Sequence, residues 1–312
     1  MKSPVLFIIF KREDATKRVF ERIREAQPPR LYIAADGPRK DRPDEVEKCQ
    51  AARKVVETID WPCEVHRLYR DENLGCGKGV SSAITWFFEH EEQGIIIEDD
   101  ILPHIDFFRY CDEMLDRYNN DESIQLITGR NSFYDDFHYD YSYYRSSLFH
   151  IWGWASWRRV WTTYQYKTSE IPLDLFIKKL YSRPLLRKTI QYWMRLFDIM
   201  QRRPIDTWDF QLYFNEIMND RYSIIPFVNM IENIGFDKEA THTQKGKTKE
   251  KTQKSRSPYP LKHPECLTEN QYADEVFAKN FGFVRKSLCS RIISKIKAVY
   301  MRLGQNIYLI ER

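Results

Sequence analysis

Three consecutive carboxylates, Glu98, Asp99 and Asp100, follow directly on the apolar run 94–97. Adjacent carboxylates repel one another unless a cation or a helix terminus compensates their charge. A hard divalent cation such as Mg²⁺ or Mn²⁺ binds through one or two carboxylates while substrate phosphates complete its shell. Decoration of a helix start is the alternative, because Asp100 lies shortly before Pro103. Since the acids end a strand-like run, we favour the metal-binding interpretation.

Two further acids, Asp206 and Asp209, stand at the start of a helix predicted at 207–219. Their spacing is close to that of a capping box, which has a structural role only. A carboxylate can also act as a general base, but that role requires a geometry that spacing alone does not supply. Both interpretations stay open at this point.

The string Trp-Gly-Trp-Ala-Ser-Trp occupies residues 152–157. Indole faces stack on the apolar faces of sugars, and indole N–H groups form directional hydrogen bonds. Tryptophans at alternating positions more often pack in a core, so packing is the expectation for any single one of them. Gly153 would let a sugar approach the backbone closely.

The glycine-rich stretch 70–79 does not fit the common phosphate-binding motifs. A P-loop would need glycine at Glu72 and serine or threonine at Gly79, and a dinucleotide fingerprint would need glycine at Val80. An NTPase is therefore not expected.

Taken together, these segments resemble the GT-A fold glycosyltransferases that use nucleoside diphosphate sugars, over roughly residues 4–243. The similarity is to N-acetylglucosaminyltransferase I and its bacterial relatives, in which Glu-Asp-Asp is a version of the DxD motif. The resemblance implies that Asp100 is a ligand of Mn²⁺ or Mg²⁺ and that Glu98 and Asp99 face the donor. It also makes His242 a second metal contact, although a lone loop histidine is as often merely solvated.

The same resemblance implies a donor site and a catalytic base. Asp209 would remove a proton from the acceptor hydroxyl, with inversion at the anomeric carbon. Arg12 and Asp36 would hold the nucleotide base and ribose. The remaining donor-binding positions that it implies are Arg70, Asn73, Gly75, Lys78, Gly153 and Trp154.

These expectations point to a hexosyltransferase that moves a sugar, with UDP as the family's usual carrier, to a glycan or lipid-linked acceptor, as in surface polysaccharide biosynthesis. A pyrophosphorylase-type nucleotidyltransferase is one alternative, but it would carry a Gly-rich basic loop after the first strand, where Lys11-Arg12-Glu13-Asp14 stands instead. A sugar-binding protein without catalytic activity is the other alternative, and it would not need the acids.

The elements that must position these residues follow from hydrophobic periodicity. Strands are predicted at 5–10, 31–35, 65–69 and 95–97, alternating with helices at 14–26, 44–59 and 78–90. Such alternation predicts parallel crossover units and a doubly wound α/β sheet. The resemblance implies the GT-A form of this fold, which is Rossmann-like, with a mostly parallel mixed sheet flanked by helices. Because ligands bind at the carboxyl ends of such strands, we expect one crevice where four strand ends meet. Further predictions are helices at 103–118, 173–180, 186–200 and 207–219, and strands at 124–128 and 222–228.

The chain divides by composition into three parts. We expect a catalytic domain at 1–243, a flexible basic loop at 244–265 and a C-terminal helical extension at 266–312. Residues 238–312 carry a net charge of +9, against −5 for the rest. Apolar positions from Val284 to Leu303 fall on one helical face, which favours packing on the body but keeps a peripheral membrane contact open.

With 42% hydrophobic and 30% charged residues, the composition is that of a soluble protein. No apolar run approaches the about 20 residues of a transmembrane helix. The six cysteines include no CxxC pair, so a zinc module or disulfide framework is not expected. The composition favours a cytoplasmic protein, at most peripheral on the inner membrane face, that does not bind nucleic acid.

Overall fold

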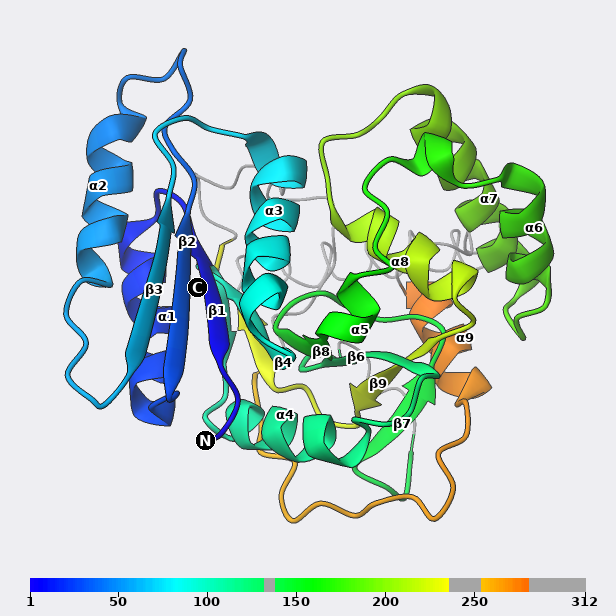
Figure 1. Ribbon diagram of the computed structural model, residues 1–312. Helices are drawn as coiled ribbons and strands as arrows, with labels where there is room; N and C mark the ends of the chain where they lie inside the picture. Colours follow the sequence, from blue (N-terminus) through cyan, green and yellow to red (C-terminus); the bar gives the residue numbers. More distant parts are fainter. Residues whose placement is uncertain (132–137, 236–253, 281–312) are drawn as a thin grey trace, which may run out of the picture.

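The computed structural model describes residues 1–131, 138–235 and 254–280. Within these residues, eight strands form one sheet in the order β3-β2-β1-β4-β8-β6-β9-β7 (Figure 1). Its strands are β1 (Val5–Ile9), β2 (Arg30–Ala35), β3 (Glu64–Tyr69), β4 (Gln93–Glu98), β6 (Ile124–Thr128), β7 (Tyr143–Ser146), β8 (Trp154–Trp157) and β9 (Tyr222–Pro226). A small antiparallel pair joins β5 (Ile101–Pro103) to β10 (Ile231–Asn233).

Six of the eight strands run in the same direction. β1 pairs in parallel with β2 and β4, β2 with β3, and β6 with β9, whereas β8 is antiparallel to both β4 and β6 and β7 is antiparallel to β9. The predicted α/β class, with a mostly parallel mixed sheet flanked by helices, is confirmed.

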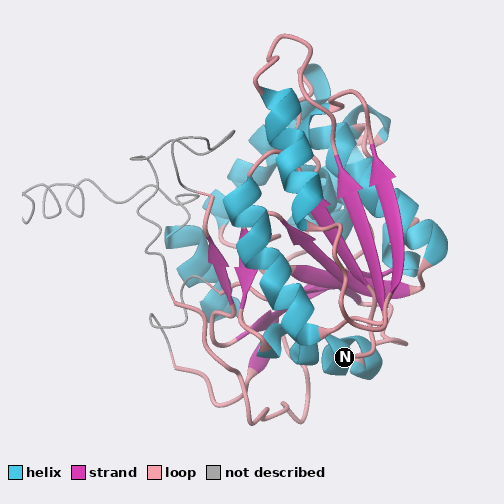
Figure 2. Cartoon of the chain, turned by 90° about the vertical axis from the view of Figure 1, so that its left-hand side faces the viewer, coloured by secondary structure: helices cyan, strands magenta, loops and turns pink. Residues whose placement is uncertain are grey.

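Helices cover both faces of the sheet (Figure 2). They are α1 (Glu13–Ala26), α2 (Glu45–Val55), α3 (Gly75–His90), α4 (Asp106–Arg117), α5 (Arg158–Trp161), α6 (Leu173–Tyr181), α7 (Arg187–Arg202), α8 (Asp209–Met218) and α9 (Gln271–Asn280), with a 3₁₀ turn at Thr168–Glu170.

Alternate residues of β1 show the two layers. Leu6 belongs to a core shared with α3 and α5 to α9, while Phe7 and Ile9 belong to one shared with α1 and α4. A parallel strand covered on both faces is apolar at every position, which explains why β1 reads Val-Leu-Phe-Ile-Ile.

The strand β8 was not predicted. It lies antiparallel between β4 and β6, and all four of its residues are buried. Trp154 and Trp157 are 1% and 2% exposed. Because β8 is short and buried on both faces, its sequence carries no strand periodicity that would separate it from a sugar-binding motif.

The remaining predicted boundaries shift by a few residues. α2 ends at Val55 rather than at 59, α8 begins at Asp209 rather than at 207, and the segment predicted as helix from 103 begins with β5 and becomes helical at Asp106. Such shifts are expected at element ends, where the periodic pattern gives way to local turn chemistry.

The described part of the predicted basic loop, residues 254–265, lies on the body of the protein as irregular backbone. The hydroxyl of Tyr259 donates to Glu113 (3.3 Å), and the guanidinium of Arg109 lies 4.0 Å from the Tyr259 ring centroid. The backbone N–H of Lys262 donates to the Ser142 hydroxyl (2.8 Å). Residues 244–253, and the predicted C-terminal helix beyond 280, lie outside the described residues.

None of the helices that the structure describes has the length and apolar character needed to cross a membrane.

Candidate functional site

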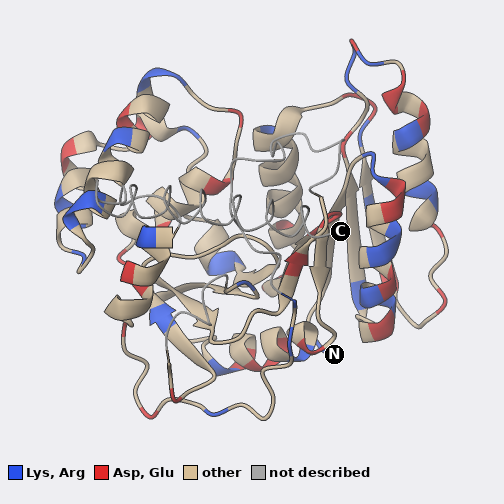
Figure 3. Ribbon diagram, turned by 180° about the vertical axis from the view of Figure 1, so that it is seen from behind, with Lys and Arg blue, Asp and Glu red and all other residues tan. Residues whose placement is uncertain are grey.

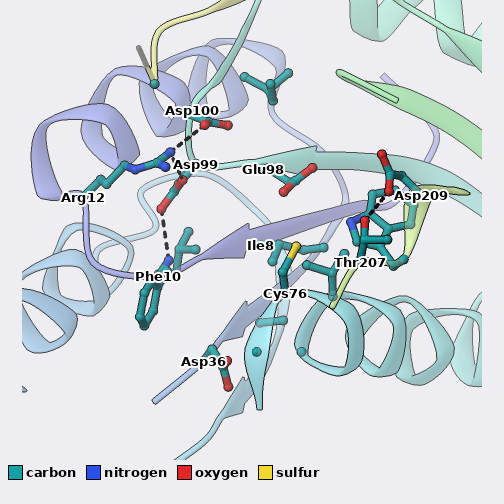
Figure 4. Close-up of a pocket in the computed structure, with 18 of the residues that line it drawn as sticks. Ile8, Phe10, Arg12, Asp36, Cys76, Glu98, Asp99, Asp100, Thr207 and Asp209 are labelled. Carbon is teal, nitrogen blue, oxygen red and sulfur yellow. Dashed lines mark hydrogen bonds and ion pairs between the residues drawn. The ribbon is translucent and has the colours of Figure 1, made fainter. Parts of the chain in front are cut away.

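A cavity of about 550 Å³ opens at the carboxyl ends of β1, β2, β3 and β4. Arg12 reaches it from the end of β1, Asp36 from β2, Arg70 from β3 and the acidic triplet from β4, whereas Asp209 comes from the start of α8 on another wall (Figure 4). The expected meeting of four strand ends in one crevice is confirmed. Its volume lies in the range typical of small-molecule sites.

Arg12 compensates the charge of two of the three consecutive acids. Its guanidinium Nη1 lies 2.5 Å from Oδ2 of Asp100 and 3.4 Å from Oδ1 of Asp99. The second oxygen of Asp99 accepts a hydrogen bond from the backbone N–H of Phe10 (3.0 Å). Asp99 is thus tied to the end of β1, while Asp100 retains the more exposed side chain of the two, at 19%.

Glu98 points away from this ion pair. Figure 4 shows its carboxyl between the Arg12, Asp99 and Asp100 group and the more distant Asp209. Burial, followed by the charges of Asp100 and Asp99, raises the pKa of Glu98. The recessed floor of the cavity therefore favours the neutral form of this carboxyl, which can donate a hydrogen bond.

Polar groups from β2 and the loop after β3 form the other end of the cavity. Both carboxylate oxygens of Asp36 accept from the backbone N–H of Leu74 (3.1 and 2.9 Å), and burial raises the pKa of Asp36. Arg70 donates to the Ser82 hydroxyl (2.9 Å), and Asn73 donates to the carbonyl of Gly37 (3.0 Å). These contacts fix the loop 70–75 against the end of β2 and against α3.

The N-terminus of α3 is bound by a carboxylate from a distant part of the chain. Asp206 accepts from the backbone N–H of Cys76 through Oδ2 (3.1 Å) and from that of Gly77 through Oδ1 (2.8 Å). Gly75 has φ +81°, and a Cβ there would lie 2.6 Å from Oδ2 of Asp206. This glycine thus serves the close approach of a protein carboxylate. Asp206 does not cap α8, whose cap residue Trp208 makes no side-chain capping bond.

Asp209 is held through one of its two oxygens. The Thr207 hydroxyl and the backbone N–H of Phe210 (2.9 Å) both donate to Oδ1. Oδ2 accepts no hydrogen bond from the residues that the structure describes. A carboxylate oriented in this way can accept a proton from a ligand in the cavity.

Four predicted site residues do not line the cavity or cannot be placed. Lys78 is exposed on α3 and is absent from the lining, as are Gly153 and Trp154. Trp154 stacks on Trp208 in the core, with ring centroids 5.8 Å apart. Gly153, at φ +64°, makes room for Ile231, whose side chain would lie 2.6 Å from a Cβ there. His242 lies outside the described residues.

The structure brings residues into the site that sequence reasoning did not assign to it: Trp152, Cys76, Asp206 and Thr207. Burial raises the pKa of the Cys76 thiol to about 12, so the thiol is protonated at neutral pH. Trp152, the first residue of the tryptophan string, lies before β8 begins; it lines the cavity and also packs against the edge of the core. Sequence reasoning would have needed the position of β8 to predict which tryptophan lines the cavity.

The oxygen ligands that the cavity offers suit a hard divalent cation only if the substrate completes its coordination shell. Among the described residues, no group of three or more His, Cys, Asp or Glu side chains is arranged to hold a metal ion. A Mg²⁺ or Mn²⁺ ion shared with phosphate oxygens needs only one or two carboxylates. Asp100 fits that description, because it lines the cavity and shares its charge with a single guanidinium.

Comparison with known proteins assigns no family. No protein-family model and no curated protein sequence matches the chain. Similar solved structures include UDP-glucose pyrophosphorylase complexed with UDP-glucose (9% identity, TM-score 0.38, covering 75% of this chain and 94% of that one). Mouse xyloside xylosyltransferase 1 is another, with 9% identity and a TM-score of 0.35 over 70% of this chain and 81% of that one. A third is 4-diphosphocytidyl-2C-methyl-D-erythritol synthase from Anaerococcus prevotii, with 8% identity and a TM-score of 0.32 over 68% of this chain and 97% of that one. Scores at this level assign no activity.

Proposed function

We propose that the chain is a metal-dependent, inverting glycosyltransferase that uses a nucleoside diphosphate sugar, with a UDP-sugar as the donor to test first. One observation carries the proposal: a single cavity is lined by the acids that end β4, by polar groups that end β2 and β3, and by a carboxylate with an unoccupied oxygen on α8. The acceptor is a glycan or lipid-linked hydroxyl.

The donor would lie along the carboxyl edge of the sheet. Asp36, Arg70 and Asn73 offer carboxylate, guanidinium and amide groups to the nucleoside. The diphosphate would then lie near Arg12 and Asp100, where a bound Mg²⁺ or Mn²⁺ would neutralise the charge of the leaving group. Arg12 already carries a positive charge to this place and orients both aspartates.

Asp209 acts as the general base in this proposal. Thr207 and the N–H of Phe210 fix its Oδ1, which directs Oδ2 to the acceptor hydroxyl and leaves it free to take the proton. A single displacement needs the base and the leaving group on opposite sides of the anomeric carbon. The separation of Asp209 from the Arg12, Asp99 and Asp100 group in Figure 4 supports that arrangement.

The first experiment is a screen of nucleotide sugars for stabilisation of the protein against heat, with and without Mn²⁺. We expect one donor class to raise Tm only with the metal. Stabilisation by no nucleotide sugar would contradict the proposal. Formation of a nucleoside triphosphate from donor and pyrophosphate would indicate a nucleotidyltransferase, and binding without turnover a sugar-binding protein.

The second experiment separates the two aspartates. Asp209→Asn should keep the metal-dependent Tm shift and lower transfer by about 10²- to 10⁴-fold, as for loss of a general base. Asp100→Asn should lose the metal-dependent part of the shift as well. Asp116→Asn, at an exposed aspartate of α4 with 53% side-chain exposure, is the matched control and should change neither. Normal transfer by Asp209→Asn would remove it as the base.

A further inference from the structure

The helices α6 and α7 form a hairpin whose inner face packs in the hydrophobic core. Ile190, Trp193, Phe197 and Met200 of α7 are all buried, and Phe197 stacks on Phe176 of α6 with ring centroids 4.0 Å apart. The outer face of the hairpin has no such partner among the described residues. The side chains on this outer face therefore indicate which kind of surface it can bind.

The outer face of α7 is a stripe of basic and apolar side chains. Residues three or four positions apart share one face of a helix. Five exposed or half-exposed residues at this spacing form the stripe, namely Lys188, Gln191, Arg195, Ile199 and Arg202. One acid lies on the same face, where Asp198 pairs with Arg202 (2.8 Å). Among the described residues, this leaves Lys188 and Arg195 as the unpaired cations of the stripe.

Large apolar side chains are also exposed along the hairpin and just after it. Of the nine that the structure leaves exposed, five lie between residues 173 and 205: Leu173, Leu175, Tyr181, Ile199 and Ile205. Gln201 donates to the carbonyls of Ile171 (2.9 Å) and Thr168 (3.4 Å), which brings the last turn of α7 to the start of α6. Leu173 and Ile199 thus belong to the same end of the hairpin.

The hairpin is also strongly basic, as Figure 3 shows. Residues 173–205 contain eight Lys and Arg and two Asp, a net charge of +6. Five of these cations form no ion pair with any residue that the structure describes: Lys178, Arg187, Lys188, Arg195 and Arg203. Unpaired cations alternating with exposed Leu and Ile are typical of surfaces that lie on anionic lipid.

We propose that the α6–α7 hairpin is a membrane-contact surface that binds anionic phospholipid headgroups. The apolar side chains would enter the headgroup region while the cations pair with lipid phosphates. This inference rests on the charge and exposure of the hairpin and does not depend on the proposed reaction.

The hairpin is connected along the chain to one wall of the candidate site. The chain leaves α7 at Arg202 and within seven residues reaches Asp209, passing through Asp206, Thr207 and Trp208, which line the cavity. The segment 203–208 thus connects the proposed membrane-contact surface directly to the wall that carries the proposed base.

The test is sedimentation of the full chain with phospholipid vesicles. We expect binding to vesicles of phosphatidylcholine mixed with phosphatidylglycerol, and little binding to pure phosphatidylcholine. The double variant Lys188→Glu, Arg195→Glu should lower the partition coefficient between vesicles and water at least about tenfold, because each basic residue near an anionic surface strengthens the binding of the protein to the vesicles. High salt should weaken binding by the wild type.

Two further variants keep the test specific. Lys17→Glu, Arg18→Glu on α1, also exposed, applies the same charge change elsewhere and should leave binding unchanged. Leu173→Ser, Ile199→Ser removes apolar surface without changing charge and should also weaken binding. Equal losses from the α1 and α7 reversals, or no loss from the α7 reversal, would overturn the proposal. Binding to an acidic protein but not to anionic vesicles would do the same.

Discussion

The contact between Asp206 and the N-terminus of α3 predicts how the two sides of the cavity are held together. The carboxylate accepts two backbone N–H groups, from Cys76 and Gly77, across about 130 residues of sequence. Three residues further on stands Asp209. Replacement by alanine should release the segment 203–208 from α3 and leave the proposed base without a fixed position.

The size of the effect on stability follows from the geometry. Loss of a side-chain cap from a helix N-terminus costs about 0.5–2 kcal/mol, and loss of a negative charge there costs about 0.3–1 kcal/mol more. Asp206 is exposed, so water replaces part of what is lost. We therefore expect Asp206→Ala to lower the free energy of unfolding by about 1–2 kcal/mol.

The effect on transfer should exceed the effect on stability. A displacement of a catalytic group by about 1 Å can cost about 10²-fold in rate. We expect Asp206→Ala to lower kcat by about that factor at a temperature where the variant is fully folded. Asp206→Asn keeps an acceptor oxygen for one of the two N–H groups, so it should recover part of kcat.

The assays are urea unfolding followed by circular dichroism, and steady-state transfer with the donor found in the screen. A structural role alone would lower stability without changing kcat of the folded protein. An alanine variant with unchanged kcat and unchanged unfolding midpoint would refute the reasoning. An asparagine variant no better than alanine would show that the hydrogen bonds do not carry the effect.

Three further predictions concern neighbouring features. Thr207→Val removes the hydroxyl that orients Asp209 and should lower kcat about tenfold with little change in KM, whereas Thr207→Ser, the matched control, should retain activity; steady-state kinetics would check both. Gly153→Ala places a Cβ 2.6 Å from Ile231 at φ +64° and should lower Tm by a few degrees, for about 1–2 kcal/mol of strain; an unchanged Tm would contradict the close contact. Burial raises the pKa of the Asp274 carboxyl to about 8, above the value of about 3.9 in an unfolded chain. Between about pH 4 and pH 8 the folded state therefore keeps a proton on Asp274 that the unfolded chain has lost. The free energy of unfolding should fall as pH rises through this range. Asp274→Asn should reduce that fall by at least about 1.4 kcal/mol, the equivalent of one pKa unit, as measured by urea unfolding at pH 5 and pH 8; an unchanged pH dependence would show that Asp274 is ionised throughout.

The strand ends of the site were predictable because they follow from local pattern. β1, β2 and β4 are largely apolar runs and β3 alternates polar and apolar residues; polar or charged residues follow at all four ends, and parallel strands bring such ends together. Arg12, Asp36, Arg70 and the acids after β4 line one cavity for that reason.

The rest of the site depends on contacts that no local pattern encodes. Asp206 binds the start of α3 from a position about 130 residues later. At the sequence level, the spacing of Asp206 and Asp209 indicates a capping box on one helix, whereas the structure uses Asp206 on a different helix. Trp152 reaches the cavity and Trp154 does not, because Trp152 precedes β8 and Trp154 lies within it. The position of β8 follows from its pairing with β4 and β6.

The central location of β8 also limits how the chain can be divided. β8 fills the gap between β4 and β6, yet both of those strands are synthesised before it. A fragment released near residue 150 would expose the unpaired backbone of β4 and β6 along two apolar edges, a template for edge-to-edge aggregation. We therefore expect a protein truncated at that point to aggregate, because β4 and β6 would both lack the strand that pairs with them.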